Sequence, residues 1–128
     1  MRLNELQQAL FNEITQATGL PVFSNPAPQD TPYPYATIDD IEASAWDTDN
    51  SLGFSSLVQI HTFHQSQSRA DSYAAQGAIY SALHYNDSMI MSSYHLVGCV
   101  QQFATVRTEA NQEIQHGIQR FLITIEEL

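Results

Sequence analysis

Apolar residues recur every three or four positions at the start of the chain, while Gln, Asn and Glu occupy the positions between them. The recurring apolar positions after Leu3 are Leu6, Leu10, Ile14 and Ala17. This spacing is typical of an amphipathic helix. Gly19 suits a left-handed cap and Pro21 cannot continue a helix. We therefore predict a helix from Leu3 that ends near Thr18.

The next segments show the alternation typical of strands. Residues 21–34 hold all five prolines and leave room only for a short extended piece at Val22 and Phe23. Segments 35–46 and 55–64 are rich in β-branched and aromatic residues and flank a polar turn at 47–53, which predicts an antiparallel hairpin. In 55–64 one face would carry Val58, Ile60 and Thr62, and the other Leu57, Gln59, His61 and Phe63. Ile38 and Ile41 fall on opposite faces, which a bulge or a two-sided strand would explain.

The second half of the chain begins with another helical segment. Ser68, with Asp71 three residues later, resembles a capping box, so a helix should start there and end near Tyr85. Its small and apolar positions cover more than half of the circumference, which predicts tight packing: Ala70, Tyr73, Ala74, Gly77, Ala78 and Ser81, together with Ala75, Ile79, Ala82 and Leu83.

Two long strands should follow, at 94–108 and 117–126, joined by a polar turn at 109–113. The predicted fold is α+β, a single domain over residues 1–128. A mainly antiparallel sheet carries two helices on one face, in the order α-β-β-α-β-β.

Charge narrows the possible functions. The chain has 14 Asp and Glu against 4 basic residues, all of them Arg, and a formal net charge of −10. Without lysine there is no Walker-type phosphate loop and no Schiff-base chemistry, and without a basic surface there is no grip on nucleic acid or an anionic membrane. The single cysteine excludes an internal disulfide and fits a reducing compartment. We expect neither a secretory signal nor a membrane span, which would need roughly 18 apolar residues.

Two groups of residues offer candidate metal ligands. Asp39, Asp40 and Glu42 offer oxygen ligands, but on a strand only Asp40 and Glu42 share a side. His61 and His64 are three residues apart, a spacing that sends them to opposite faces of a strand. We therefore expect no metal and no cofactor.

No sequence motif indicates a catalytic nucleophile. No GxSxG element is present. Cys99 lies in the middle of a predicted strand and should be a buried, inert thiol. Gly98 and Gly117 should mark bulges or close backbone approach. No catalytic residue is predicted.

Aromatic and basic residues outside the predicted core are interface candidates. The aromatic candidates are Tyr33, Tyr35 and Trp46, which could instead cover the open edge of the sheet. The basic candidates are Arg69, Arg107 and Arg120, which we expect to pair with carboxylates, within the subunit or across to a neighbour.

The order of these segments resembles a known family. The segments that carry the resemblance are PYPYATIDDI at 32–41, a W-x-T turn at 46–48, SLVQIHTFHQSQSRADSYAAQGAIYSAL at 56–83 and HGIQRFLITIEE at 116–127. Together they resemble the tail completion, or tail terminator, proteins of long-tailed bacteriophages and related prophages. The strand-to-helix segment and the last strand are the most specific parts.

The resemblance implies a non-enzymatic virion protein. Such subunits form a ring, commonly a hexamer, on the head-proximal end of the tail tube. The ring ends polymerisation of the major tail tube protein and offers its other face to the head connector. Assembly would take place in the host bacterial cytoplasm, from a subunit that can stay monomeric until it meets the tail. Genome DNA would pass through the ring without specific binding.

Acidic residues gain a possible role from this resemblance, because a negative lumen would let DNA slide. The acids and the amide expected at the ring ends or in the lumen are Asp47, Asp49, Asn50, Glu109 and Glu113. The edges of strands 35–46 and 117–126 would meet neighbours.

Three alternatives remain open. One is another neck or head-completion (connector-adaptor) protein of the same virion. Another is an acidic DNA-mimic inhibitor, although the acids are spread along the whole chain. The last is an enzyme with a carboxylate site at Asp40 and Glu42.

Overall fold

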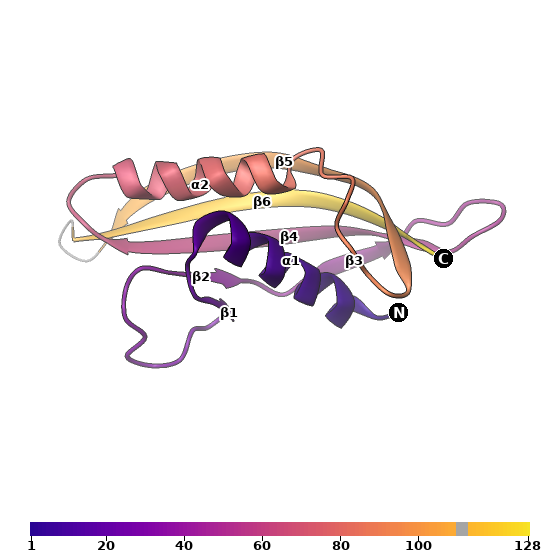
Figure 1. Ribbon diagram of the computed structural model, residues 1–128, viewed down its shortest axis with the longest axis horizontal. Coiled ribbons are helices and arrows are strands. Elements are labelled where there is room, and N and C mark those ends of the chain that lie inside the picture. The colour runs from indigo at the N-terminus through magenta and orange to yellow at the C-terminus, as the bar shows by residue number, and fades with distance from the viewer. Residues whose placement is uncertain (110–112) are drawn as a thin grey trace.

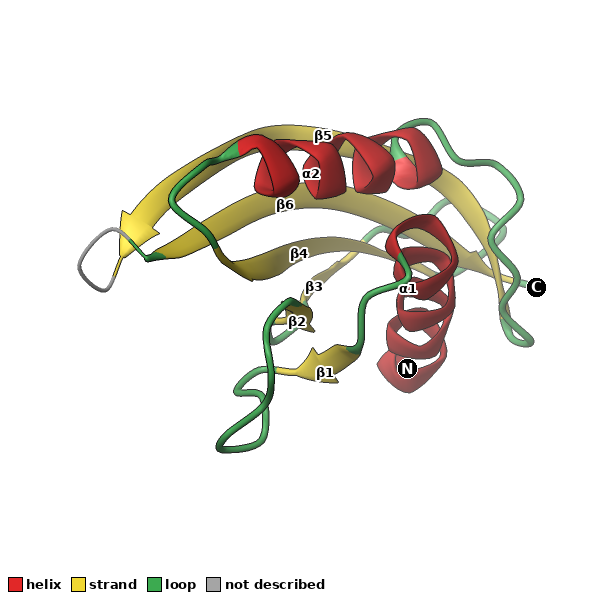
Figure 2. Cartoon of the chain, turned by 60° about the vertical axis from the view of Figure 1, so that its left-hand side comes forward, coloured by secondary structure: helices red, strands yellow, loops and turns green. Residues whose placement is uncertain are grey.

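The computed structural model describes residues 1–109 and 113–128. Within these residues the chain forms two layers, a long twisted sheet and a pair of helices that cover one of its faces (Figures 1 and 2). The elements are α1 (Leu3–Thr18), β1 (Val22–Ser24), β2 (Tyr35–Ile38), β3 (Glu42–Ala45), β4 (Gly53–Gln65), α2 (Ala70–Leu83), β5 (Tyr94–Glu109) and β6 (Ile114–Glu127). The predicted α+β class, with helices on one face, is confirmed. None of the helices in the described part of the chain has the length and apolarity needed to cross a bilayer.

The sheet has the order β1-β2-β4-β6-β5, and β3 also pairs with β4. β1 and β2 are parallel and the other neighbours are antiparallel, so both predicted hairpins are present. β6 lies between β4 and β5 along its length. The expectation that strand 117–126 offers an outer edge is therefore wrong, and β5 is the edge strand on that side of the described sheet.

Helix α1 has the predicted bounds. Gly19 caps it at φ 70°, and its N–H donates to the carbonyl of Thr15. The buried face is the one that the periodicity predicts, with Leu6, Ala9, Leu10 and Ile14. Glu5 in the first turn accepts a hydrogen bond from the Ser93 N–H at 2.8 Å, and hydrogen bonding to the Ser93 side chain and then to its backbone lowers the pKa of Glu5. The short extended piece at Val22 and Phe23 is confirmed as β1.

The strand predicted at 35–46 is interrupted. β2 ends where Ile38 pairs with Ile60, and β3 begins where Glu42 pairs with Leu57. Three residues, 39–41, thus lie opposite two residues of β4, 58–59. One extra residue on one of two paired strands is typical of a β-bulge. The interruption puts Ile38 in the core and lets Ile41 pack against it from the connection.

Helix α2 buries a single stripe rather than most of its circumference. The buried residues are Ser72, Ala75, Gln76, Ile79 and Leu83. The predicted set that runs from Ala70 to Ser81 faces outward instead, with Tyr73 58% exposed and a Cβ on Gly77 meeting nothing within 4 Å. The prediction that more than half of the helix surface is packed is therefore wrong, because the sheet contacts only one side of α2. The helix also starts later than predicted, at Ala70, whose N–H donates to Ser68 Oγ.

Polar side chains fill the space between α2 and the sheet. The Gln76 amide donates to the carbonyl of Thr105 at 2.8 Å, and Gln119 donates to the carbonyl of Gln76 at 3.0 Å. A Cβ on Gly117 would lie 2.3 Å from Thr62 Oγ1. The close approach expected at Gly117 is confirmed, as is the irregularity expected at Gly98, which borders a register shift of β5. Hydrogen bonds between amides thus lie beside the apolar contacts that Ile79 and Leu83 make beneath this helix.

His64 belongs to the same layer and gives a pH-dependent stability. It is 8% exposed, and burial lowers its pKa, opposed in part by Asp71. Because the unfolded chain binds a proton on this ring more readily than the native chain does, acidification through about pH 6.5 should favour unfolding. His64→Gln should flatten that loss of stability in denaturant titrations at pH 7.5, 6.5 and 5.5. His95→Gln, at an exposed ring, should leave the slope unchanged, and parallel curves for His64→Gln and the native chain would contradict the assignment.

Candidate interaction surfaces

The face of the sheet opposite the helices is open in the described part of the chain (Figure 2). The side chains that alternate away from the buried core positions of β4 and β6 lie on it: Leu57, Gln59, His61 and Phe63, and His116, Ile118, Arg120 and Leu122. The two faces predicted for residues 55–64 are confirmed. His61 and His64 do lie on opposite faces.

Aromatic rings form a row across this open face. The ring centroids of Tyr33 and Tyr35 are 5.5 Å apart, those of Tyr35 and Phe63 4.9 Å, and those of Phe63 and His116 4.4 Å. The interplanar angles of 27°, 25° and 19° make all of them stacked pairs. Tyr33 remains 41% exposed. The predicted tyrosines therefore lie over the sheet face instead of at its edge, and their interface role remains a prediction.

A chain of carboxylates and imidazoles runs beside this row. Asp39 Oδ2 lies 2.8 Å from His61 Nε2, His61 Nδ1 lies 2.7 Å from His116 Nε2, and His116 Nδ1 lies 2.8 Å from Glu109 Oε1. The chain joins the β2–β3 connection to β4, β6 and β5. Sequence reading missed it because His61 and His116 are 55 residues apart. The only signal was that both rings occupy outward positions of alternating strands.

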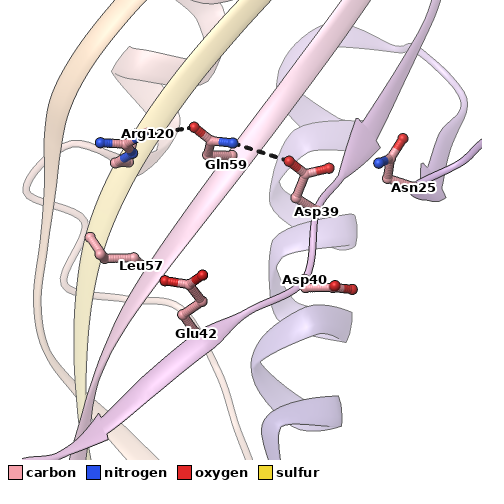
Figure 3. A pocket seen from close by; sticks show the side chains of 7 residues that line it. All are labelled: Asn25, Asp39, Asp40, Glu42, Leu57, Gln59 and Arg120. Carbon is pink, nitrogen blue, oxygen red and sulfur yellow. Dashed lines mark hydrogen bonds between the residues drawn. The ribbon is translucent and has the colours of Figure 1, made fainter.

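A depression of about 530 Å³ lies next to this chain (Figure 3). Its lining residues are Asn25, Asp39, Asp40, Glu42, Leu57, Gln59 and Arg120. Arg120 donates to Gln59 Oε1 at 3.0 Å, and Gln59 Nε2 donates to Asp39 Oδ2 at 3.1 Å. In Figure 3 the Asp40 carboxylate points away from Glu42, so these acids do not converge as they would on a continuous strand. Among residues 1–109 and 113–128, no group of three or more His, Cys, Asp or Glu is placed to hold a metal ion.

The arginines contact neutral partners within the subunit. Arg69 donates to Thr108 Oγ1 at 2.9 Å, and the Arg120 guanidinium lies 4.8 Å from the centre of the Phe103 ring. Arg107 is exposed. All ion pairs found among the described residues involve histidine, so the expected pairing of arginines with carboxylates of the same subunit is wrong. Pairing across to a neighbour remains a prediction.

The acids predicted at ring ends lie at opposite ends of the molecule (Figure 1). Asp47, Asp49 and Asn50 are exposed beside the exposed Trp46 in the β3–β4 connection, which we call the loop end. Glu109 and Glu113 are exposed at the far end of β5 and β6, the hairpin end; residues 110–112 of the predicted turn lie outside the described residues. Because β4 pairs with β6 from Gly53 to Gln65, about 40 Å of sheet separates the two ends at about 3.3 Å per residue.

Cys99 is fully buried in β5, and burial raises the pKa of its thiol to about 12. Such a thiol stays protonated at neutral pH and is a poor nucleophile. The expected buried position is confirmed.

Comparison with known proteins places this geometry in a family. The family model for tail completion protein gp17 matches residues 5–126. A chain in the virion of a native gene transfer agent particle shares the fold, with a TM-score of 0.80 and 19% identity over 96% of both chains. The gp17 protein of bacteriophage SPP1 also shares it, with a TM-score of 0.53 and 22% identity over 97% of this chain and 88% of the other. No curated protein matches the sequence. The chain belongs to the gp17 family of phage tail completion proteins.

Proposed function

We propose that this protein forms a homomeric ring, of six subunits as is common for such proteins, that caps the head-proximal end of the phage tail tube. The ring stops polymerisation of the major tail tube protein and presents its other face to the head connector at the tail–head junction. It assembles in the host cytoplasm from subunits that stay monomeric until they meet the tube. The family match over residues 5–126 is the observation that carries this proposal.

The separation of the loop end from the hairpin end supports two-sided contact. A subunit about 40 Å long, with polar, exposed groups at each end of a continuous sheet, can touch one partner with each end. Acidic residues mark both ends, at Asp47 and Asp49 and at Glu109 and Glu113. With the net charge of −10, acids facing the lumen would repel phosphates and let the genome pass without binding.

Neighbouring subunits would meet through the sides and the open face of the sheet. In the described part of the chain, β5 is the outer strand on one side, and β1 and β3 are outer strands on the other. The side chains that we propose for this contact are Tyr33, Tyr35, Trp46, Arg69, Arg107 and Arg120. Arg107 is exposed on β5, where it can reach a carboxylate of the next subunit.

Assembly with tail tube protein tests the proposal. Purified protein added to polymerising tube protein should shorten the tubes seen by electron microscopy, and phage lacking the gene should make overlong, headless tails. Asp47→Lys with Asp49→Lys should weaken binding at one end of the subunit, and Glu113→Lys at the other. We expect one variant to lose the tube and the other the connector, with unchanged circular dichroism.

Capture of the portal without the tube, together with unchanged tube lengths, would instead favour a head-completion or connector-adaptor protein. Capture of a nucleic-acid-binding protein in place of either would favour the DNA-mimic inhibitor. Binding of Mg²⁺, Mn²⁺ or Ca²⁺ that raises the melting temperature would favour the carboxylate enzyme site at Asp40 and Glu42.

A further inference from the structure

We propose that Asp39, His61, His116 and Glu109 form a proton-binding chain that holds the hairpin end of the sheet and releases it as the pH rises. This inference is independent of the ring and of its partners. It rests on the contacts at 2.8, 2.7 and 2.8 Å described above, which engage every ring nitrogen of both imidazoles.

Counting protons shows what the chain requires. Each of its hydrogen bonds needs one hydrogen between the two heavy atoms, so the chain needs three. Ionised carboxylates supply none, and each neutral imidazole supplies one. The complete chain therefore holds one imidazolium and carries a charge of −1, where two neutral rings between two carboxylates would carry −2.

The surroundings of the rings favour this extra proton. The side chains of His61 and His116 are 13% and 15% exposed, and Asp39 is 24% exposed, so water screens the attraction between the rings and Asp39 poorly and screens Glu109, at 47% exposed, more. Phe63 stacks on His116 at 4.4 Å, and an aromatic face attracts positive charge. Arg107 opposes it, because it is the Cα partner of His116 on the same face of the sheet.

The remaining neighbours act at the ends of the chain. Arg120 reaches Asp39 only through Gln59. Two other titratable side chains, Tyr33 and Tyr35, lie on the same face in the aromatic row, where Tyr35 stacks on Phe63. On the other face, α2 packs against β4 and β6 and does not contact these rings.

Loss of the proton should open the chain at Glu109. One of the three contacts then has a lone pair on both heavy atoms and no hydrogen between them, so it repels. The contact that breaks is the one at the end that is held less firmly. Gln59 also holds Asp39: Gln59 Nε2 donates to Asp39 Oδ2 at 3.1 Å, and the Asp39 N–H donates to the Gln59 carbonyl at 3.0 Å. Glu109 is 47% exposed and has only His116 as a side-chain partner among the described residues. Since Glu109 is the last residue of β5, its release loosens the base of the hairpin end.

The sign of the stability effect follows from the same count. The native protein binds a proton that the unfolded protein lacks. The contribution of this proton to the free energy of unfolding is therefore present at lower pH and is lost as the pH rises. This is opposite in sign to the effect of His64.

Glu109→Gln tests the proposal because a glutamine can donate to His116 Nδ1. The chain is then complete with two neutral rings and needs no extra proton. The matched control is Glu126→Gln, which alters the His95–Glu126 pair at the other end of the same strands, where the contact is 3.3 Å and His95 is 51% exposed.

Side-chain ¹⁵N spectra of the histidines provide the measurement. At about pH 8, above the ordinary pKa of a histidine side chain, the His61–His116 pair should still show one imidazolium in the native protein and in Glu126→Gln, and none in Glu109→Gln. Above that pH, the unfolding equilibrium constant of the native chain should rise by up to about tenfold per pH unit relative to Glu109→Gln. Two neutral rings in the native chain at that pH would overturn the proposal, as would an imidazolium that persists in Glu109→Gln.

Asp39→Asn is the second variant, and it serves if Glu109→Gln does not fold. An asparagine can donate to His61 Nε2, after which His61 Nδ1 donates to His116 Nε2 and His116 Nδ1 donates to Glu109, so two neutral rings complete the hydrogen bonds without the extra proton. The pair should then show no imidazolium at the same pH, and persistence of the signal would overturn the proposal.

Discussion

Replacing Phe121 with alanine should lower the free energy of unfolding by about 3–5 kcal/mol, the usual cost of a large cavity in a core. Phe121 is 0% exposed, and it is the largest of the fully buried side chains described. It lies on β6 between Val58 of β4 and Gln101 of β5. Strands on both sides keep the backbone from collapsing into the space, so most of the cavity should remain. Denaturant unfolding followed by circular dichroism measures the loss.

Phe103→Ala is the matched control. Phe103 is 38% exposed on the open face and contacts Arg120. Its removal should cost less than half as much, because water already reaches the ring. Equal losses for the two variants would contradict the placement of the core between the helices and the sheet.

Gly53→Ala should cost about 1–3 kcal/mol, the usual range for overpacking in a core. A Cβ at this position would lie 2.6 Å from the carbonyl oxygens of both Ile125 and Trp46. Neither oxygen can move freely, since Gly53 pairs with Glu126 and its own carbonyl accepts the Trp46 N–H at 2.8 Å. The loop end should shift along with the strand, so thermal unfolding and the fluorescence of Trp46 should both change.

Gly77→Ala provides the opposite case. Gly77 lies in α2, and an added Cβ would meet nothing within 4 Å. Alanine should raise the stability by about 0.5–1 kcal/mol because it is the better helix former. If Gly53→Ala and Gly77→Ala change the free energy of unfolding by the same amount and in the same direction, crowding at Gly53 does not explain why glycine is needed there.

Local sequence patterns predicted the helices and strands whose limits are set by residues nearby in the sequence. Gly19 and Pro21 gave the end of α1, and alternation gave the two faces of β4, because caps and periodicity act within a few residues. The exposed stripe of α2 could not be found in this way, since small side chains suit a sheet contact and a free surface equally. Gly53 was assigned to a turn, and its constraint arises only where β3, β4 and β6 meet.

The candidate surfaces were harder to predict because they depend on register. The imidazoles of His61 and His116 meet only because Phe63 pairs with His116 and His61 with Ile118, a pairing that a single sequence does not encode in any local pattern. The arginines were expected to find carboxylates on the basis of composition alone. Arg120 lies opposite Gln59 and Phe103 across the strands, and Arg69, just before α2, reaches Thr108 of β5, so their partners are neutral groups.

The position of β6 also determines how the two ends of the subunit can move. Its residues are hydrogen-bonded to β5 on one side and to β4 on the other for nearly the whole length of the strand. We expect the amide protons of such a strand to exchange with solvent only when the whole sheet opens, so the strand should have no local hinge. A force at the loop end should therefore tilt the molecule as one stiff body and move the hairpin end with it.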